Sequence, residues 1–167
     1  MSDRDITLVM ARNAIVAALY FGLTMMLGSL SFMNIQFRIS EILILLCFFR
    51  KDYSIGLILG CLIANMFSPL GLADVIFGTL ATAISCLAII FLKWLAIAAV
   101  VPVIANAFIV GAELFYVYDL PFWMSALEVA IGELVVLTPG YIFFMIIGKR
   151  RSIQKVIAAN QNLDFKW

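Results

Sequence analysis

Apolar residues fall into long stretches along this chain, and short groups of charged residues, proline and glycine separate them. The stretches cover residues 7–32, 35–49, 53–67, 73–92, 94–116 and 122–147. A helix needs about 20 apolar residues to cross the hydrocarbon core of a membrane. Stretches 35–49 and 53–67 are shorter, so we expect them to be tilted, locally unwound or shielded by neighbouring helices. The alternation typical of a membrane β-barrel is missing, which predicts an all-α integral membrane protein with six transmembrane helices.

Composition supports a membrane environment. Apolar residues make up 65% of the chain and charged residues only 13%, whereas soluble chains have about 45–50% and about 25%. We therefore expect one transmembrane domain over residues 1–167, in which residues 148–167 form a basic cytoplasmic tail.

The distribution of basic residues predicts the orientation. Lysine and arginine mark cytoplasmic loops, and ten of the eleven flank the termini or follow the second and fourth stretches. These ten are Arg4, Arg12, Arg50, Lys51, Lys93, Lys149, Arg150, Arg151, Lys155 and Lys166. With six spans, both termini should lie in the cytoplasm.

Polar residues inside the apolar stretches are candidate binding residues, because a charge at the bilayer centre costs about 2.5–3.5 kcal/mol. They are Arg38, Glu41, Asn65, Asp74, Asn106, Glu113, Glu128 and Glu133. All fall in the outer half or the middle of their predicted helices, which indicates a polar cavity open to the outside. Acids outnumber bases five to one, so a ligand with N–H groups or an amine would suit them. Glu128 and Glu133 are five residues apart and should point in different directions.

Structural roles are alternatives for several of these residues. Arg38 and Glu41 could form an ion pair within one helix, since they are three residues apart. Asp74 could cap the start of its helix, and Asn65 could serve as a hydrogen bond between helices. Glu113 could be solvated at the membrane surface.

Small residues form a second pattern, in the first stretch. Ala14, Ala18 and Gly22 are spaced by four residues, and Ala11 precedes them. Small residues at this spacing let another helix approach closely. The stripe could bind a partner from the cytoplasmic side or pack within the bundle.

The sequence lacks the usual catalytic and nucleotide-binding patterns. It has no histidine, no G-x-x-x-x-G-K-[ST] loop, no G-x-S-x-G and no H-E-x-x-H. Cys47, Cys61 and Cys86 all lie in apolar stretches, which favours reduced thiols. We therefore expect no catalytic residues, metal site, cofactor or nucleic-acid partner, and no ATPase site of its own.

Three local strings are similar to a known family. They are Ile-Gln-Phe-Arg-Ile-Ser-Glu at 35–41, Gly-Cys-Leu-Ile-Ala-Asn at 60–65 and Asp-Val-Ile-Phe-Gly-Thr-Leu-Ala-Thr at 74–82. They resemble the QueT family of queuosine-precursor uptake proteins, which are substrate-capture (S) components of energy-coupling factor (ECF) transporters. The resemblance implies a multi-pass protein of a bacterial cell membrane that works with a transmembrane coupling subunit and two ATP-binding cassette ATPases. It would bind a 7-deazaguanine base outside and topple in the membrane to release it inside.

The resemblance also suggests roles for individual residues. Ala14 and Ala18 match the Ala-x-x-x-Ala stripe that contacts the coupling subunit in such families, and Gly22 continues it. A carboxylate such as Glu113 or Glu128 could accept the ring N–H and amino group of a guanine-like edge, while Asn65 or Asn106 could meet its carbonyl. The flat ring could stack on Phe37, Tyr116 or Trp123.

Other functions remain open from the sequence. The chain could be an S component for another vitamin, or a small secondary transporter in which Glu128 or Glu133 carries protons. An intramembrane hydrolase would need two converging carboxylates, and a structural subunit would have no use for an outward polar cavity.

Overall fold

The computed structural model describes residues 3–28 and 37–167, and most of these residues are helical. The elements are α1 (Asp3–Met26), the 3-10 helix η1 (Ile39–Leu45), α3 (Leu46–Phe49), α4 (Tyr53–Asn65), α5 (Leu72–Ile90), α6 (Leu95–Tyr118), α7 (Phe122–Ile147) and α8 (Arg151–Val156). The described part of the chain contains no β-strand, only a single bridge between Trp94 and Lys166. The all-α prediction is therefore confirmed.

Four helices, α1, α5, α6 and α7, are long and apolar enough to cross a membrane. The segments Ile39–Phe49 and Tyr53–Asn65 are apolar but shorter. Residues 29–32 of the first predicted span and 35–36 of the second lie outside the described residues. The count of six spans therefore stays a prediction.

The shortest apolar segment, η1 with α3, lies at the centre of the bundle. It packs against α1, α4, α5, α6 and α7, and every residue from Leu46 to Phe49 is buried. Seven residues of 3-10 helix are unusually many, because the hydrogen bonds of this helix are poorer than those of an α-helix. Such irregular backbone is tolerated at membrane depth where protein surrounds it. The surrounding helices thus explain how this segment can be both short and locally unwound.

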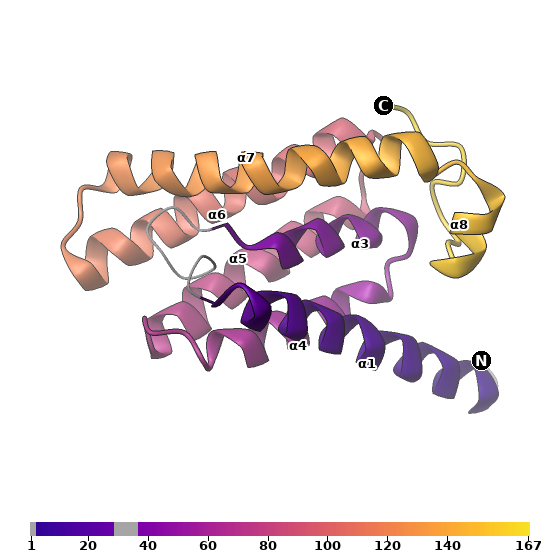
Figure 1. Cartoon of the computed structure of the whole chain (residues 1–167), viewed down its shortest axis with the longest axis horizontal. Helices are drawn as coiled ribbons and strands as arrows, with labels where there is room; N and C mark the ends of the chain where they lie inside the picture. The colour runs from indigo at the N-terminus through magenta and orange to yellow at the C-terminus, as the bar shows by residue number, and fades with distance from the viewer. Residues whose placement is uncertain (1–2, 29–36) are drawn as a thin grey trace.

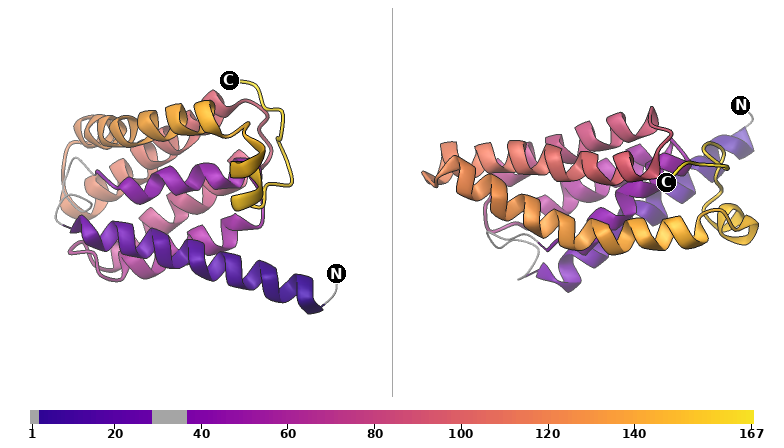
Figure 2. Two further views of the ribbon diagram at one scale, coloured as in Figure 1. Left: turned by 45° about the vertical axis from the view of Figure 1, so that its right-hand side comes forward. Right: turned by 90° about the horizontal axis from the view of Figure 1, so that it is seen from above.

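The remaining helices enclose this segment in the order α1, α4, α5, α6, α7, with α6 beside α7 and α1 beside α4 (Figure 1). The start of α1 and the short α8 lie at the same end of the bundle in both figures (Figure 2). We call this the terminal end. The opposite, distal end carries the connections 66–71 and 119–121.

Two glycines let α4 pack directly against α1. A Cβ atom at Gly60 would lie 2.8 Å from the carbonyl oxygen of Ala17, and one at Gly56 would lie 2.9 Å from Asn13 Oδ1. In the space left free, the Gly56 N–H donates a hydrogen bond to Asn13 Oδ1 at 2.7 Å. This contact fixes which face of α1 is turned toward the bundle.

The C-terminal tail folds over the terminal end of the bundle, which the prediction of a basic tail did not anticipate. The side-chain amides of Gln161 and Asn162 donate hydrogen bonds to the carbonyl oxygens of Cys47 and Phe48. Phe165 is buried and packs edge-on against the rings of Phe48 and Phe49. The tail thereby satisfies carbonyls that a helix leaves unpaired at its C-terminus.

We expect Phe165→Ala to lower the free energy of unfolding by about 3 kcal/mol, because it leaves a cavity among buried aromatic rings. Thermal unfolding of the purified protein in detergent measures this. Leu163→Ala is the control, since that side chain is 43% exposed. Equal unfolding temperatures of the two variants would show that the tail is not part of the core.

Candidate functional site: a buried cluster of carboxyl groups

Four carboxyl groups and one guanidinium are buried in the middle and distal part of the bundle. They belong to Arg38 and Glu41 of the η1 segment, Asp74 of α5, Glu113 of α6 and Glu133 of α7. Glu113 lies within electrostatic range of Asp74 and Arg38, and Glu133 within range of Glu41 and Arg38. We call these five residues the carboxyl cluster. It has a surplus of acid, as the sequence predicted.

Arg38 is the cation of the carboxyl cluster. Its Nη2 atom lies 3.6 Å from Asp74 Oδ2, and its Nη1 atom lies 3.9 Å from the Cys61 sulfur. The ion pair therefore joins α5 to the segment of η1 and α3, residues 38–49, which we call the central segment. The alternative of an ion pair within one helix, between Arg38 and Glu41, does not describe this arrangement.

Glu41 is held by α1 instead. The Tyr20 hydroxyl donates a hydrogen bond to Glu41 Oε1. One turn further along α1, the hydroxyls of Thr24 and Ser40 are 2.7 Å apart. Both contacts are buried, so the inward face of α1 positions the start of the central segment.

Asn65 joins α4 to α5, which confirms its interhelical hydrogen bond. Its Nδ2 atom lies 3.1 Å from the Asp74 carbonyl oxygen and 3.3 Å from Thr79 Oγ1. Asp74 is not the helix cap, because α5 starts after Gly71, whose φ of 66° suits glycine. Gly78 gives these side chains room: a Cβ there would lie 2.7 Å from Asp74 Oδ1 and 2.8 Å from Asn65 Nδ2.

Asn106 and Glu133 connect α6 to α7. The Asn106 amide donates a hydrogen bond of 2.9 Å to Glu133 Oε1. Glu128 is only half-buried, so the two glutamates of α7 point in different directions, as their spacing predicted. Glu113 is fully buried, which makes the alternative of a solvated surface residue wrong.

Several acceptor atoms in this region have no hydrogen-bond partner among residues 3–28 and 37–167. They are both side-chain oxygens of Glu113, Oε2 of Glu41, Oε2 of Glu133, both of Asp74, and Oδ1 of Asn65. Buried acceptors without donors are costly. Within the same residues, no three histidine, cysteine or acidic side chains are arranged to hold a metal ion. The arrangement suits an organic ligand that brings several N–H groups.

The three aromatic candidates differ in their exposure. Trp123 is 75% exposed and packs edge-on against Phe122, and Tyr116 is also exposed. Phe37 is half-buried next to Arg38. Of the three rings proposed for stacking, Phe37 is thus adjacent to the carboxyl cluster in the chain.

Sequence reasoning missed the hydroxyl groups that support the cluster. Tyr20 and Thr24 hold the central segment, and Thr82 lies 3.2 Å from the Cys61 sulfur. A signal was present: Asn13, Tyr20 and Thr24 are spaced by seven and four residues, which places them on one helix face.

The small residues of α1 lie on its outer face. Ala11, Ala14, Ala18 and Gly22 are all exposed, and a Cβ at Gly22 would meet nothing within 4 Å. The alternative of packing within the bundle is therefore wrong. The described part of the chain leaves the stripe uncovered.

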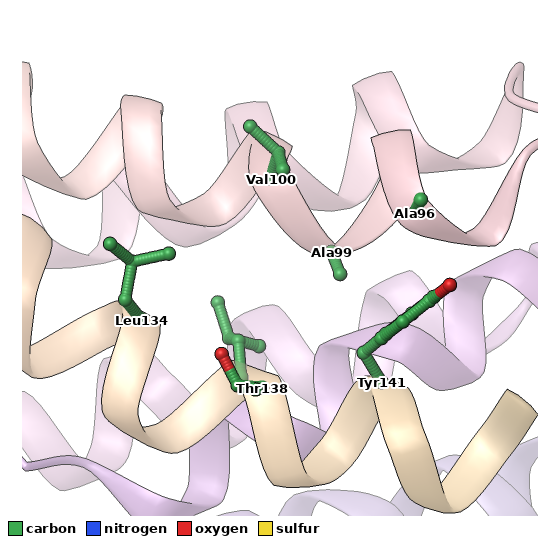
Figure 3. A pocket seen from close by; sticks show the side chains of 7 residues that line it. Ala96, Ala99, Val100, Leu134, Thr138 and Tyr141 are labelled. Carbon is green, nitrogen blue, oxygen red and sulfur yellow. The ribbon is translucent and has the colours of Figure 1, made fainter.

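A groove of about 190 Å³ lies between α6 and α7, nearer the terminal end. Figure 3 shows Leu134, Thr138 and Tyr141 of α7 across from Ala96, Ala99 and Val100 of α6. Its lining is mostly apolar and excludes the carboxyl cluster, so it is not the predicted polar cavity.

Residues 10–149 match the family described as QueT transporter. The chain belongs to this family. A stretch of 71 residues is 49% identical to the queuosine precursor transporter QueT of Lactococcus lactis subsp. cremoris (strain MG1363), and it covers 41% of each chain. The match thus spans less than half of that relative. No solved structure matches the chain. The QueT family is one of transporters, and the four long apolar helices fit a multi-pass protein of a bacterial membrane.

Proposed function

We propose that this chain is the S component of an ECF importer and binds a queuosine precursor, a 7-deazaguanine base, from outside the cell. The observation that carries the proposal is the carboxyl cluster, in which both oxygens of Glu113 have no partner among the described residues. The choice of a queuosine precursor as the substrate rests on membership of the QueT transporter family and on the name of the Lactococcus relative.

A guanine-like edge fits this chemistry. Its ring N–H and amino group point the same way, and a carboxylate can accept both hydrogen bonds. We assign this role to Glu113. The amide groups of Asn65 and Asn106 could bind the carbonyl of the base. If the ligand carries an amine, Glu41 or Glu133 would pair with its positive charge. Phe37 is the candidate for ring stacking that lies nearest to the carboxyl cluster in the sequence. Because Trp123 is exposed and Glu128 is only half-buried, both are weaker candidates for contact with the ligand.

The outer face of α1 is the proposed docking surface for the coupling subunit. Ala14, Ala18 and Gly22 are exposed there, and their small side chains would let a partner helix approach closely. The same helix contacts Glu41 through Tyr20 on its inner face. The proposal includes six spans with both termini in the cytoplasm, where two ATPases would drive the cycle.

Transport by reconstituted protein tests the mechanism. We expect liposomes with this chain, a coupling subunit and two ATPases to take up a labelled 7-deazaguanine base only when ATP is supplied. Liposomes with this chain alone should bind but not accumulate it. Accumulation by the chain alone under a pH gradient would show instead a proton-coupled carrier that uses its buried glutamates.

We expect Gly78→Ala to weaken precursor binding about 10-fold, because the new methyl group would displace Asn65 and Asp74. This loss corresponds to about 1.4 kcal/mol. Calorimetry on the purified variants measures it. Gly22→Ala is the matched control, since its methyl group would meet nothing within 4 Å. Unchanged affinity in both variants would place the ligand away from Asn65 and Asp74.

A further inference from the structure

A second polar site lies at the terminal end of the bundle, whereas the carboxyl cluster lies in the middle and distal part. It is a pocket of about 380 Å³ between α1, the connection after α3, and α8 with the following tail. Four of its lining residues are cationic: Arg12, Arg50, Arg151 and Lys155. In the described part of the chain, no acidic residue lines it. The pocket is therefore strongly positive.

Most of this positive charge is not neutralised locally. Asp52 pairs with Arg50 at 2.7 Å. Among residues 3–28 and 37–167, Arg12, Arg151 and Lys155 form no ion pair with an acid. Three cations thus face the same pocket without a counter-charge from the described part of the chain.

Hydrogen bonds hold the walls of the pocket in place. Arg50 Nη1 donates to the carbonyl oxygen of Ala158 at 2.9 Å, and the Tyr53 hydroxyl donates to that of Ile157 at 2.8 Å. Gln154 Nε2 donates to the carbonyl oxygen of Leu163 at 2.8 Å. Segments that are more than a hundred residues apart in the chain are therefore fixed together, and their cations converge in the folded protein.

The surface next to the pocket is apolar. Ile15 and Leu19 follow Arg12 by three and seven residues, so they share its face of α1. Their side chains are 59% and 51% exposed. A ligand seated on Arg12 would thus meet charge at the end of the bundle and an exposed apolar strip running toward the membrane interior.

We propose that this pocket binds the phosphate group of an anionic phospholipid, with an acyl chain along Ile15 and Leu19. Arginine and lysine bind phosphate oxygens through charge-assisted hydrogen bonds, and basic pockets at the membrane surface bind anionic head groups. The apolar strip favours a lipid over a free anion. This inference rests on the position of the protein in a membrane and is independent of its cargo.

Binding of two lipids that differ only in head group tests the proposal. The purified full chain in detergent is titrated with dioleoyl phosphatidylglycerol or dioleoyl phosphatidylcholine, and native mass spectrometry counts bound lipid. We expect at least about 10-fold tighter binding of phosphatidylglycerol, and loss of that preference in the variant R12Q/R151Q/K155Q. The control R4Q/K51Q/K93Q removes three exposed cations outside the pocket and should change the affinity less than about 2-fold.

Two further measurements keep the test decisive. Lys155→Glu alters one exposed side chain, so the protein should fold and bind phosphatidylglycerol several-fold more weakly. Inorganic phosphate and soluble glycerophosphoglycerol should not compete at the same concentration. Equal losses in the two triple variants, full binding by Lys155→Glu, or competition by the soluble phosphates would each overturn the lipid site. So would a variant R12Q/R151Q/K155Q that keeps its preference for phosphatidylglycerol.

Discussion

Replacing Glu113 with glutamine should weaken binding of a 7-deazaguanine base by about 100-fold, which corresponds to about 2.7 kcal/mol. Glutamine keeps the shape of the side chain but replaces one carboxyl oxygen with an NH2 group, so it can no longer accept two hydrogen bonds. Hydrogen bonds to a charged group are worth about 1.5–3 kcal/mol each, so this carboxylate should dominate recognition. Calorimetry on the purified chain measures the affinity.

Glu128→Gln is the matched control for this prediction, since it is the same change at a half-buried position on α7. We expect its affinity to stay within about 2-fold of the original. Glu113→Gln should not lower the unfolding temperature, because it removes one of four carboxyl groups that share a single buried cation. A loss of affinity at Glu128 but not at Glu113 would move the ligand toward the exposed side of α7.

The double variant Ala14→Leu with Ala18→Leu should abolish ATP-driven uptake and leave precursor binding unchanged. Both residues are exposed on the outer face of α1, where larger side chains would keep a partner helix from approaching closely. We expect at least a 10-fold fall in uptake by liposomes that contain the coupling subunit and the ATPases. Affinity of the solitary chain, measured by calorimetry, should not change.

Val135→Phe is the control for the docking surface. It adds comparable bulk at an exposed position of α7, away from the stripe on α1. We expect normal uptake from this variant. If the α1 variant transports normally, or if both variants fail equally, the stripe is not the docking surface.

The helices themselves could be predicted from the sequence because apolar length is a direct property of the chain. The predicted stretch 94–116 and the helix Leu95–Tyr118 nearly coincide, and 122–147 and Phe122–Ile147 have the same bounds. The central position of η1 and α3 could not be predicted. A fully buried segment and a lipid-facing one are equally apolar, so only the packing of five other helices distinguishes them.

Candidate site residues were predictable where burial in an apolar stretch is costly. Charge alone marks five residues that the fold buries in the carboxyl cluster: Arg38, Glu41, Asp74, Glu113 and Glu133. Their partners were harder to find, since Tyr20 and Thr24 are common in membrane helices and carry no charge. Gln161 and Asn162 lie in a polar tail, where nothing in the sequence indicates that their amides reach back to the end of α3.

The pairing of residues across helices was also beyond the sequence. Spacing along a helix suggested that Arg38 would meet Glu41, whereas the fold places Asp74 at 3.6 Å from Arg38 and Tyr20 at Glu41. The direction of Trp123 could not be predicted either, because an aromatic side chain on a membrane helix can face the bundle or the lipid. In the fold it is 75% exposed. Such choices depend on helix rotation, which small residues such as Gly56 and Gly60 set by close packing.

Calorimetric titration of the purified chain, alone in detergent, is the most direct test of the proposed function. The ligands are 7-deazaguanine bases, with thiamine, riboflavin and biotin as comparisons. We predict tight binding of the deazaguanines only, because the carboxyl cluster suits a flat ligand with several N–H donors. Tight binding of one of the vitamins, or no binding of any deazaguanine, would contradict the account.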